Sequence, residues 1–306
     1  MYETQQRGYA PPSPPRGPGP ATIVGTLALT VVVGLVAAFI IVIGFWPAPA
    51  ATPYAGKQAA PATAERASNA VPAPSSRITL NAAVPSTTEA AALQGGWPLI
   101  NTDEFDGLGV DLTKWQAYSG PTTDGPGQRL PERLSVANGV LTISGRGAES
   151  GGMAWQTDQS YGRWEVRART DPGAGYRPAL LLWPQAEDWP QGGELDFLDT
   201  PDPNRAQTNF VVHYGADDQR DIAAITGDFS GWHNYAIEWL PDHIAGYIDG
   251  QQVYRTDDPA KIPTRPMHLA IQQDVGPSSD GWIPALGAST PPEVKMQVDW
   301  VRVYGP

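Results

Sequence analysis

Three carboxylates lie within six residues in the stretch from 194 to 199. Glu194, Asp196 and Asp199 stand in an otherwise apolar run that reads Glu-Leu-Asp-Phe-Leu-Asp. Carboxylates this close repel one another, and burial raises the cost of ionising them further. Because such a cluster destabilises a fold, its presence indicates acid–base chemistry or metal binding.

The spacing of these carboxylates predicts a strand with one irregularity. Side chains two residues apart on a strand share a face, so Glu194 and Asp196 point the same way. Asp199 joins them only if one extra residue bulges near Phe197-Leu198. Two plainer alternatives stay open. Asp199 could simply start the turn at 200–204, whose residue types favour turns, and the other two could form an exposed strand face.

Aromatic residues flank the carboxylates on both sides. Trp183 and Trp189 precede the cluster, and His213 follows it. Tryptophans beside carboxylates suit a sugar substrate, because indole faces stack on the C–H faces of sugar rings while carboxylates act at the glycosidic bond. The alternative for each tryptophan is a place in the core, and for His213 a packing role in a strand.

Six groups of residues follow one another in an order that is typical of one enzyme family. Their sequences are Asp-Glu-Phe-Asp-Gly at 103–107 with Leu-Thr-Lys-Trp at 112–115, Asn-Gly-Val-Leu-Thr-Ile at 138–143, Tyr-Gly-Arg-Trp-Glu-Val-Arg-Ala-Arg at 161–169, Trp-Pro-Gln-Gly-Gly-Glu-Leu-Asp at 189–196, Tyr-Ala-Ile-Glu-Trp at 235–239 with Tyr-Ile-Asp-Gly at 247–250, and Val-Asp-Trp-Val-Arg-Val-Tyr at 298–304. From roughly Trp97 to Tyr304 the chain resembles glycoside hydrolase family 16, especially its bacterial laminarinase-like members.

The resemblance implies a role for each carboxylate. Glu194 matches the family's nucleophile, and Asp196 matches the middle carboxylate that tunes the nucleophile's protonation. Asp199 stands where the family has a glutamate as general acid/base. Its side chain is one methylene shorter, which sets the carboxyl about 1.5 Å further back. Retaining glycosidases hold their carboxyls about 5–5.5 Å apart and inverting ones about 6.5–9.5 Å. A slower retaining enzyme, an inverting one and an inactive site all remain open.

The resemblance also implies substrate-binding residues. Trp189 matches a cleft position, His213 stands where the family often has a cleft histidine, and Trp183 is a further candidate for the cleft. Gln272 stands where the family often has an Asn or Gln and could bond a substrate hydroxyl. Arg177 stands where the family usually has a tryptophan. If this position lines the cleft, the chain has exchanged a stacking surface for a hydrogen-bonding cation.

A structural calcium ion away from the cleft is the one cofactor that the resemblance implies. The matching positions are Glu104, the carbonyl of Gly139, and Asp299, and such oxygen ligands suit calcium. The alternative for Asp299 is an ordinary polar residue at a strand edge. No glycine-rich phosphate loop or Cys/His metal pattern is present, so we expect no organic cofactor.

The charge balance limits the possible partners. The chain has a formal net charge of −12 and no cysteine. The part before Trp97 carries slightly more cations than carboxylates, so the acidity lies in the part that follows. An acidic domain argues against binding to nucleic acid or to anionic polymers and favours a neutral polysaccharide. We expect a monomer.

The chain divides into four parts by composition. Residues 1–20 are rich in Pro and Gly and predict a disordered cytoplasmic tail. Residues 21–46 predict a transmembrane anchor, because 23–46 are 24 residues without a charge and about 20 apolar residues span a bilayer. Residues 47–96 predict an Ala/Pro-rich linker. Residues 97–306 predict a catalytic domain, which we expect outside the cell membrane because Arg7 and Arg16 precede the anchor.

A cleaved signal peptide is the alternative to the anchor, with Ala48-Pro49-Ala50 as its cleavage site. The apolar run is longer than a signal core of about 7–15 residues, which favours an anchor that stays in place. The protein would then be a single-pass membrane protein rather than a secreted one.

From residue 97 onward the pattern predicts an all-β fold. Short runs such as 140–143 and 235–239 alternate apolar and polar residues between turns rich in Pro, Gly and Asp. Asp249-Gly250 predicts a tight hairpin turn. Spacing alone indicates a sandwich or a barrel, and the resemblance narrows this to a β-jelly-roll sandwich with a concave substrate cleft.

The sequence thus predicts a membrane-anchored, extracytoplasmic glycoside hydrolase. It would cleave internal β-glycosidic bonds of a neutral polysaccharide by a retaining two-carboxylate mechanism, with β-1,3-glucan as the default substrate by resemblance. Two alternatives stay open: a polysaccharide-binding or wall-anchoring module whose acid/base is impaired, and a transglycosylase that remodels wall polymer.

Overall fold

The computed structural model describes residues 71–80, 89–90, 95–122 and 124–306. The predicted tail at 1–20, the predicted anchor at 23–46 and the first part of the predicted linker lie outside the described residues. Within them, none of the helices has both the length and the apolar character that a membrane crossing requires.

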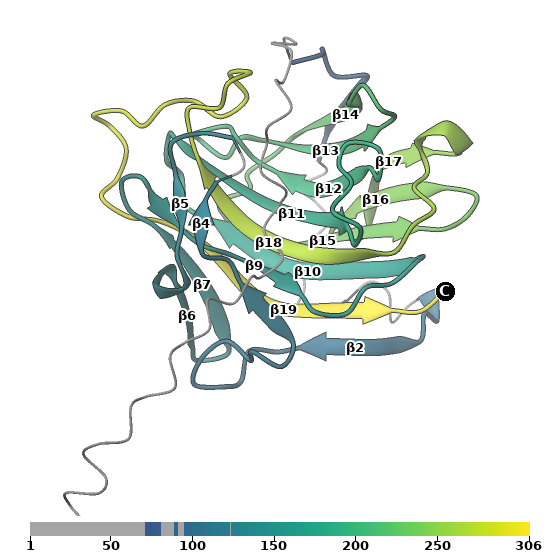
Figure 1. Cartoon of the computed structure of the whole chain (residues 1–306), viewed down its shortest axis with the longest axis horizontal. Coiled ribbons are helices and arrows are strands. Elements are labelled where there is room, and N and C mark those ends of the chain that lie inside the picture. The colour runs from purple at the N-terminus through teal and green to yellow at the C-terminus, as the bar shows by residue number, and fades with distance from the viewer. Residues whose placement is uncertain (1–70, 81–88, 91–94, 123) are drawn as a thin grey trace, which may run out of the picture. The chain divides into compact units, whose positions relative to one another are not determined.

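Two large β-sheets make up the described part of the chain (Figure 1). In spatial order, sheet A contains β1 (Ser76–Thr79), β14 (Gln219–Thr226), β13 (Gln207–Tyr214), β12 (Glu194–Asp199), β11 (Tyr176–Pro184), β18 (Met267–Val275), β9 (Gly152–Trp155) and β3 (Trp115–Ala117). Sheet B contains β17 (Gln251–Thr256), β16 (Ile244–Ile248), β15 (His233–Trp239), β10 (Gly162–Thr170), β19 (Val294–Tyr304), β7 (Val140–Gly145) and β6 (Leu134–Ala137), and β2 (Leu99–Asp103) also pairs with β19.

Short elements complete the chain. A small third sheet consists of β4 (Gly120–Pro121), β5 (Gln128–Arg129) and β8 (Glu149–Ser150). Two single-turn 3₁₀ helices lie at Pro131–Arg133 and Pro259–Lys261. The predicted all-β sandwich is therefore confirmed for the described residues.

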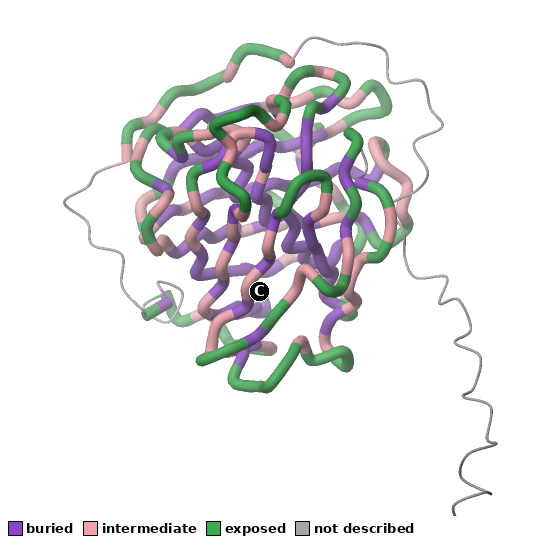
Figure 2. Tube along the Cα trace, turned by 90° about the vertical axis from the view of Figure 1, so that its left-hand side faces the viewer, coloured by how far each residue is buried: buried purple, intermediate pink, exposed green. Residues whose placement is uncertain are grey.

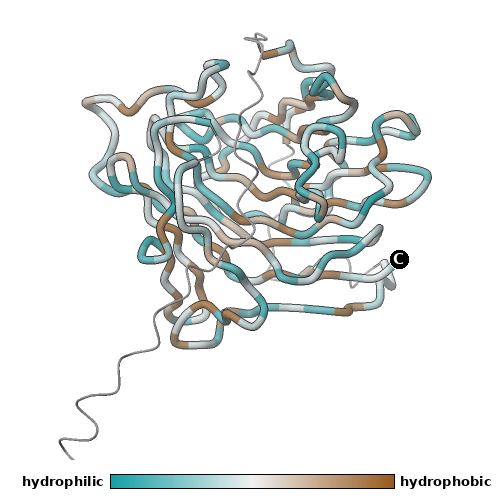
Figure 3. The backbone as a smooth tube through the Cα atoms, viewed as in Figure 1, coloured by the Kyte–Doolittle hydropathy of each residue, from teal (hydrophilic) through white to brown (hydrophobic). Residues whose placement is uncertain are grey.

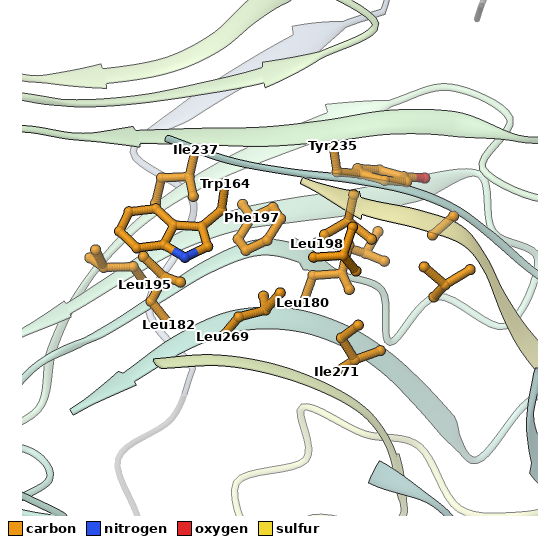
Figure 4. Close-up of a cluster of buried hydrophobic side chains, with 14 of the residues drawn as sticks. Trp164, Leu180, Leu182, Leu195, Phe197, Leu198, Tyr235, Ile237, Leu269 and Ile271 are labelled. Carbon is orange, nitrogen blue, oxygen red and sulfur yellow. The ribbon is translucent and has the colours of Figure 1, made fainter. Parts of the chain in front are cut away.

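The core fills the space between the two sheets (Figure 4). Leu195, Phe197 and Leu198 from β12 meet Trp164 and Ile237 from sheet B, and all five are buried. Apolar side chains of this size contribute about 1.5–3 kcal/mol each when fully buried. The position of β12 is therefore fixed by its inward face.

Burial follows the expected two-residue period in β7 of sheet B but not in the middle of sheet A. In β7 buried and half-buried residues alternate, with Leu141 and Ile143 turned inward. In β12 and β18 every residue is buried. Figure 2 shows the buried residues gathered in the interior of the described part of the chain, and Figure 3 shows that hydrophilic and hydrophobic residues are interleaved along the strands. Polar side chains must therefore be packed on the outer face of sheet A.

The predicted hairpin turn is confirmed. Asp249 and Gly250 connect β16 to β17, and both have positive φ angles, 51° and 78°. Positive φ at both central residues is the geometry that a two-residue type I′ turn requires.

Strand β1 lies inside the segment predicted as a linker. It pairs in parallel with β14 at the edge of sheet A, with Ile78 opposite Ile225. Ser75 contacts Asp221, whose Oδ2 also accepts hydrogen bonds from Lys261 Nζ at 2.7 Å and Tyr254 OH at 2.9 Å. The end of the predicted linker is therefore part of the folded unit, which the Ala/Pro-rich composition did not reveal.

Candidate active site

A β-bulge in β12 brings the three carboxylates together. Asp196 lies opposite Leu181 of β11, but Leu198 lies opposite Leu180, so Phe197 is the extra residue. The register with β13 shifts at the same place. The predicted bulge near Phe197-Leu198 is confirmed. Asp199 is the last residue of the strand, and its side chain is buried on the outer face of sheet A.

A cavity lies on this outer face. It is lined by alternate residues of the central strands of sheet A, and among the predicted site residues it takes in Arg177, Trp183, Glu194, Asp199, His213 and Gln272. The core residues Leu180, Leu182 and Ile271 occupy the intervening positions on the other face. The two-residue period of the strands thus separates a polar cavity from the apolar core.

Two of the predicted residues lie behind the cavity wall. Trp189 stacks on Trp183 with ring centroids 6.3 Å apart and planes inclined by 7°, and its ring lies 6.2 Å from that of His213. Asp196 is completely buried. Trp183 therefore presents its ring to the cavity, while Trp189 supports it.

Arg177 contacts carboxylates. Its Nε donates to Asp199 Oδ1 at 2.6 Å, its Nη2 to Asp196 Oδ1 at 3.3 Å, and its Nη1 lies 3.5 Å from Asp274 Oδ2. The second oxygen of Asp199 accepts a hydrogen bond from Trp282 Nε1 at 2.9 Å. Burial raises the pKa of Asp199, and the nearby Arg177 charge opposes that rise.

A histidine stands on the other side of the cluster. His213 Nδ1 lies 2.6 Å from Asp218 Oδ1, and Nε2 lies 3.4 Å from Asp196 Oδ2. Burial by itself would lower the pKa of His213, but Glu194, Asp196 and Asp218 outweigh it and raise the pKa to about 10. His213 is therefore a cation at neutral pH.

Glu194 is poised to titrate near neutral pH. Burial and the charge of Asp196 raise its pKa to about 7, although His213 and Arg177 oppose the rise. A buried carboxyl whose pKa is this high lies in the range where active-site groups change charge.

Several residues of the site were not predicted. Trp282 comes from an irregular loop between β18 and β19 that shows no periodicity, so the sequence could not place it. Asp274 follows Gln272 by two residues on β18 and therefore shares its face, and Gln272 Nε2 donates to it at 3.0 Å. Arg129 also binds Asp274, with Nε 3.0 Å from Oδ1. Strand spacing could have found Asp274 once Gln272 was chosen.

Both carboxylates predicted to hold calcium, Glu104 and Asp299, contact arginines. The Glu104 carboxylate accepts hydrogen bonds from Arg302 at 3.0 and 3.1 Å and from Thr102 at 2.8 Å. Asp299 Oδ2 lies 3.2 Å from Arg167 Nε. Burial opposes ionisation of Glu104, but the Arg302 and Thr102 hydrogen bonds outweigh it and lower its pKa. Both carboxylates thus have cationic partners in this structure, and the calcium site stays a prediction.

A family comparison identifies the chain. The profile of "Glycosyl hydrolases family 16" matches residues 129–302, more than half of its length. The chain belongs to glycoside hydrolase family 16. It is therefore a glycoside hydrolase by family, as the resemblance implied.

Named relatives agree with this assignment. A "Beta-glucanase" of Rhodothermus marinus is 29% identical, with 68% of this chain and 85% of that enzyme covered. A "Glucan endo-1,3-beta-glucosidase A1" of Niallia circulans is 27% identical, with 68% of this chain but only 38% of the relative covered. The chain thus spans most of the first relative and well under half of the second.

Solved structures share the fold. The laminarinase catalytic domain of Thermotoga maritima superposes with a TM-score of 0.63 at 23% sequence identity. The match covers 69% of this chain and 98% of the laminarinase chain. The endo-β-1,3-glucanase of Pyrococcus furiosus gives a TM-score of 0.64 at 23% identity, with 68% and 94% covered. The β-jelly-roll sandwich expected for residues 97–306 is thereby confirmed.

The raised pKa of Glu194 generates a pH prediction. A nucleophilic carboxylate attacks only when ionised, so kcat/KM should rise with pH through about 7. The measurement uses an activated aryl glycoside, because a 2,4-dinitrophenolate leaving group needs no proton. His213→Asn removes a cation that lowers this pKa, so the midpoint should move upward. A midpoint of the pH profile near the ordinary pKa of glutamate would contradict the burial of Glu194 beside Asp196.

The predicted calcium site can be tested by metal removal. If an ion binds at Glu104, Gly139 and Asp299, excess chelator should lower Tm, because a ligand of the native state stabilises it by mass action. Asp299→Ala should remove this sensitivity. If the arginine pairs are the native arrangement, chelator should leave the Tm of metal-loaded protein unchanged.

Proposed function

We propose that this protein is an endo-acting β-glucan hydrolase that uses Glu194 and Asp199 in a retaining mechanism. The observation that carries the proposal is the bulge at Phe197. The bulge turns the Asp199 side chain into the cavity that Glu194, Trp183 and Trp282 also line. Retaining glycosidases need two carboxyl groups on either side of the scissile bond.

Each residue then has a step to perform. Glu194 attacks the anomeric carbon, the bond to the leaving oxygen breaks, and Asp199 gives that oxygen a proton. Asp199 next takes a proton from water, which attacks the same carbon and releases Glu194. Asp196 lies beneath them and, with His213, sets the charge around the nucleophile. The two displacements leave the configuration of the sugar unchanged.

The substrate proposal rests on the cavity and on the relatives. Trp183 offers an aromatic face beside the carboxylates, and such faces stack on neutral sugar rings. Several relatives carry names of β-glucanases and endo-1,3-β-glucosidases. We therefore propose β-1,3-glucan as the first candidate. A "Keratan-sulfate endo-1,4-beta-galactosidase" of Sphingobacterium multivorum, 27% identical, shows why other polymers belong in the test.

A polysaccharide-binding module is the second candidate. The observation that favours it is the state of Asp199, whose two oxygens already accept hydrogen bonds from Arg177 and Trp282. Hydrogen bonds to both oxygens favour the ionised form of a carboxyl group, which carries no proton to give to the leaving oxygen.

Glu194→Gln tests the nucleophile. The amide keeps the shape of the side chain and cannot form the glycosyl-enzyme, so hydrolysis should fall by several orders of magnitude while polysaccharide binding survives. The assay incubates the protein with β-1,3-glucan, mixed-linkage glucan and keratan sulfate and reads the products by mass spectrometry. Glu293→Gln, on a surface ion pair with Arg146, is the matched control and should keep full activity.

The outcomes separate the candidates. Fragments that disappear with Glu194→Gln support the hydrolase, and binding without fragments supports the module. Products longer than the substrate would indicate a transglycosylase. Unchanged hydrolysis by Glu194→Gln would exclude the assigned nucleophile.

We also propose that residues 23–46 anchor the protein in the cell membrane with the domain outside. The support is the uncharged run of 24 residues. The protein should then fractionate with membranes and keep its N-terminal peptide, while protease added to intact cells should reach the domain. A mature N-terminus at Ala51 would show instead that the segment is removed as a signal peptide.

A further inference from the structure

Each oxygen of the Asp199 carboxyl group accepts a hydrogen bond from a strong donor. Arg177 Nε lies 2.6 Å from Oδ1 and Trp282 Nε1 lies 2.9 Å from Oδ2. The carboxyl group is almost completely buried, so water does not compete for these bonds. Donors aimed at both oxygens stabilise the ionised form of a carboxyl group over the protonated one.

Arg177 is itself held in place by the strand next to its own. Asp274 Oδ2 on β18 lies 3.5 Å from Arg177 Nη1, and Asp274 is bound in turn by Arg129 and Gln272. Arg177 is also largely buried, and the three carboxylates raise its pKa well above the usual value. The guanidinium therefore stays charged at any pH at which the fold survives.

We propose, on the basis of the function proposed above, that Arg177 is a positioning residue that holds Asp199 in its ionised, proton-accepting form. Protonation of the leaving oxygen then limits the rate of the first displacement. The second displacement is favoured, because there an ionised Asp199 accepts a proton from the attacking water. Arg177 thus acts on the general acid and does not bind the sugar, which differs from the role implied by the resemblance.

Burial and the charge of Asp196 raise the pKa of Asp199 on balance, and Arg177 is the group that opposes this rise most strongly. The groups that face the site are Arg177 on β11, Asp196 and Glu194 on β12, His213 on β13, Asp274 on β18 and Asp280 on the loop after β18. The other two arginines of the cavity bind other carboxylates: Arg129 binds Asp274, and Arg220 binds Asp218 and Asp280. Among these groups, Arg177 is the cation that contacts Asp199.

A ratio of two rate constants isolates the protonation of Asp199. Cleavage of the polymer needs ionised Glu194 and protonated Asp199, whereas cleavage of the matching 2,4-dinitrophenyl oligosaccharide needs only ionised Glu194. The ratio of the two kcat/KM values therefore falls with pH as Asp199 loses its proton. In the native full-length chain it should already be small at neutral pH.

Arg177→Gln is the deciding variant. A nearby opposite charge lowers a carboxyl pKa by about one to three units, so its removal should move the midpoint of the ratio up by at least about one unit. At a pH above both midpoints the ratio should rise about tenfold or more. The kcat for the aryl substrate should fall if the second displacement limits it, because less Asp199 is ionised. Arg177→Lys keeps the charge and should stay near the native midpoint.

Two control variants test whether the shift comes from the contact with Asp199 rather than from any change in the cavity. Arg220→Gln removes a cation that binds Asp218 and Asp280, so it should leave the midpoint of the ratio where it is. Trp282→Phe removes the donor to Oδ2 without a charge and should give an upward shift smaller than that of Arg177→Gln. If Arg177→Gln does not fold, Trp282→Phe replaces it as the test of whether donors to Asp199 lower its pKa.

A carbon-13 NMR titration keeps the inference separate from the proposed function. The Asp199 carboxyl resonance, assigned by its loss in Asp199→Asn, should titrate at higher pH in Arg177→Gln than in the native protein. If the native protein cleaves neither substrate, the proposed function fails and this titration still decides the role of Arg177. An unshifted resonance overturns the inference. So does an unshifted ratio with a raised KM for the polymer, which would make Arg177 a sugar-binding residue.

Discussion

The placement of one extra residue in β12 governs the rest of this site. Without Phe197 as a bulge, the strict alternation of the strand would turn Asp199 inward, toward the apolar core. A buried unpaired carboxylate costs several kcal/mol, so that register is strongly disfavoured. With the bulge, Leu195, Phe197 and Leu198 all reach the core and three carboxylates reach the outer face. The core thus holds the active-site geometry in place, because shifting the bulge would expose apolar side chains and bury charged ones.

The outer face then has to balance several buried charges. Its carboxylates are matched by Arg177, Arg129 and the protonated His213. Buried charges that are paired and hydrogen-bonded survive because the partners replace the lost hydration. Glu194 is exceptional, since burial and Asp196 together raise its pKa to about 7 despite two nearby cations. Two carboxyl groups on one strand therefore have different environments, and different environments separate their chemical roles.

Two departures from the family pattern lie in direct contact. The proposed acid/base position carries Asp199 where the resemblance implies a glutamate, and the position where the resemblance implies a tryptophan carries Arg177, whose Nε lies 2.6 Å from Asp199. A shorter acid and a cation that binds it make chemical sense as a pair, because the arginine fork fixes a carboxylate that reaches less far. Together they distinguish this protein from a typical member of the family and make leaving-group protonation the step most open to change.

The sequence by itself determined the fold class, the family and the identity of the carboxylate cluster. Alternation, the Asp249-Gly250 turn and the spacing of Glu194, Asp196 and Asp199 depend on contacts along one strand or across one hairpin, and such local rules can be read from the chain. That β1 joins sheet A and that Trp282 reaches Asp199 could not be predicted, because these contacts join segments far apart in the chain. The partners of Arg177, Glu104 and Asp299 were likewise decided only by the tertiary structure. A long charged side chain can turn toward sugar, calcium or a neighbouring carboxylate, and only packing of the strands determines which of these lies within reach.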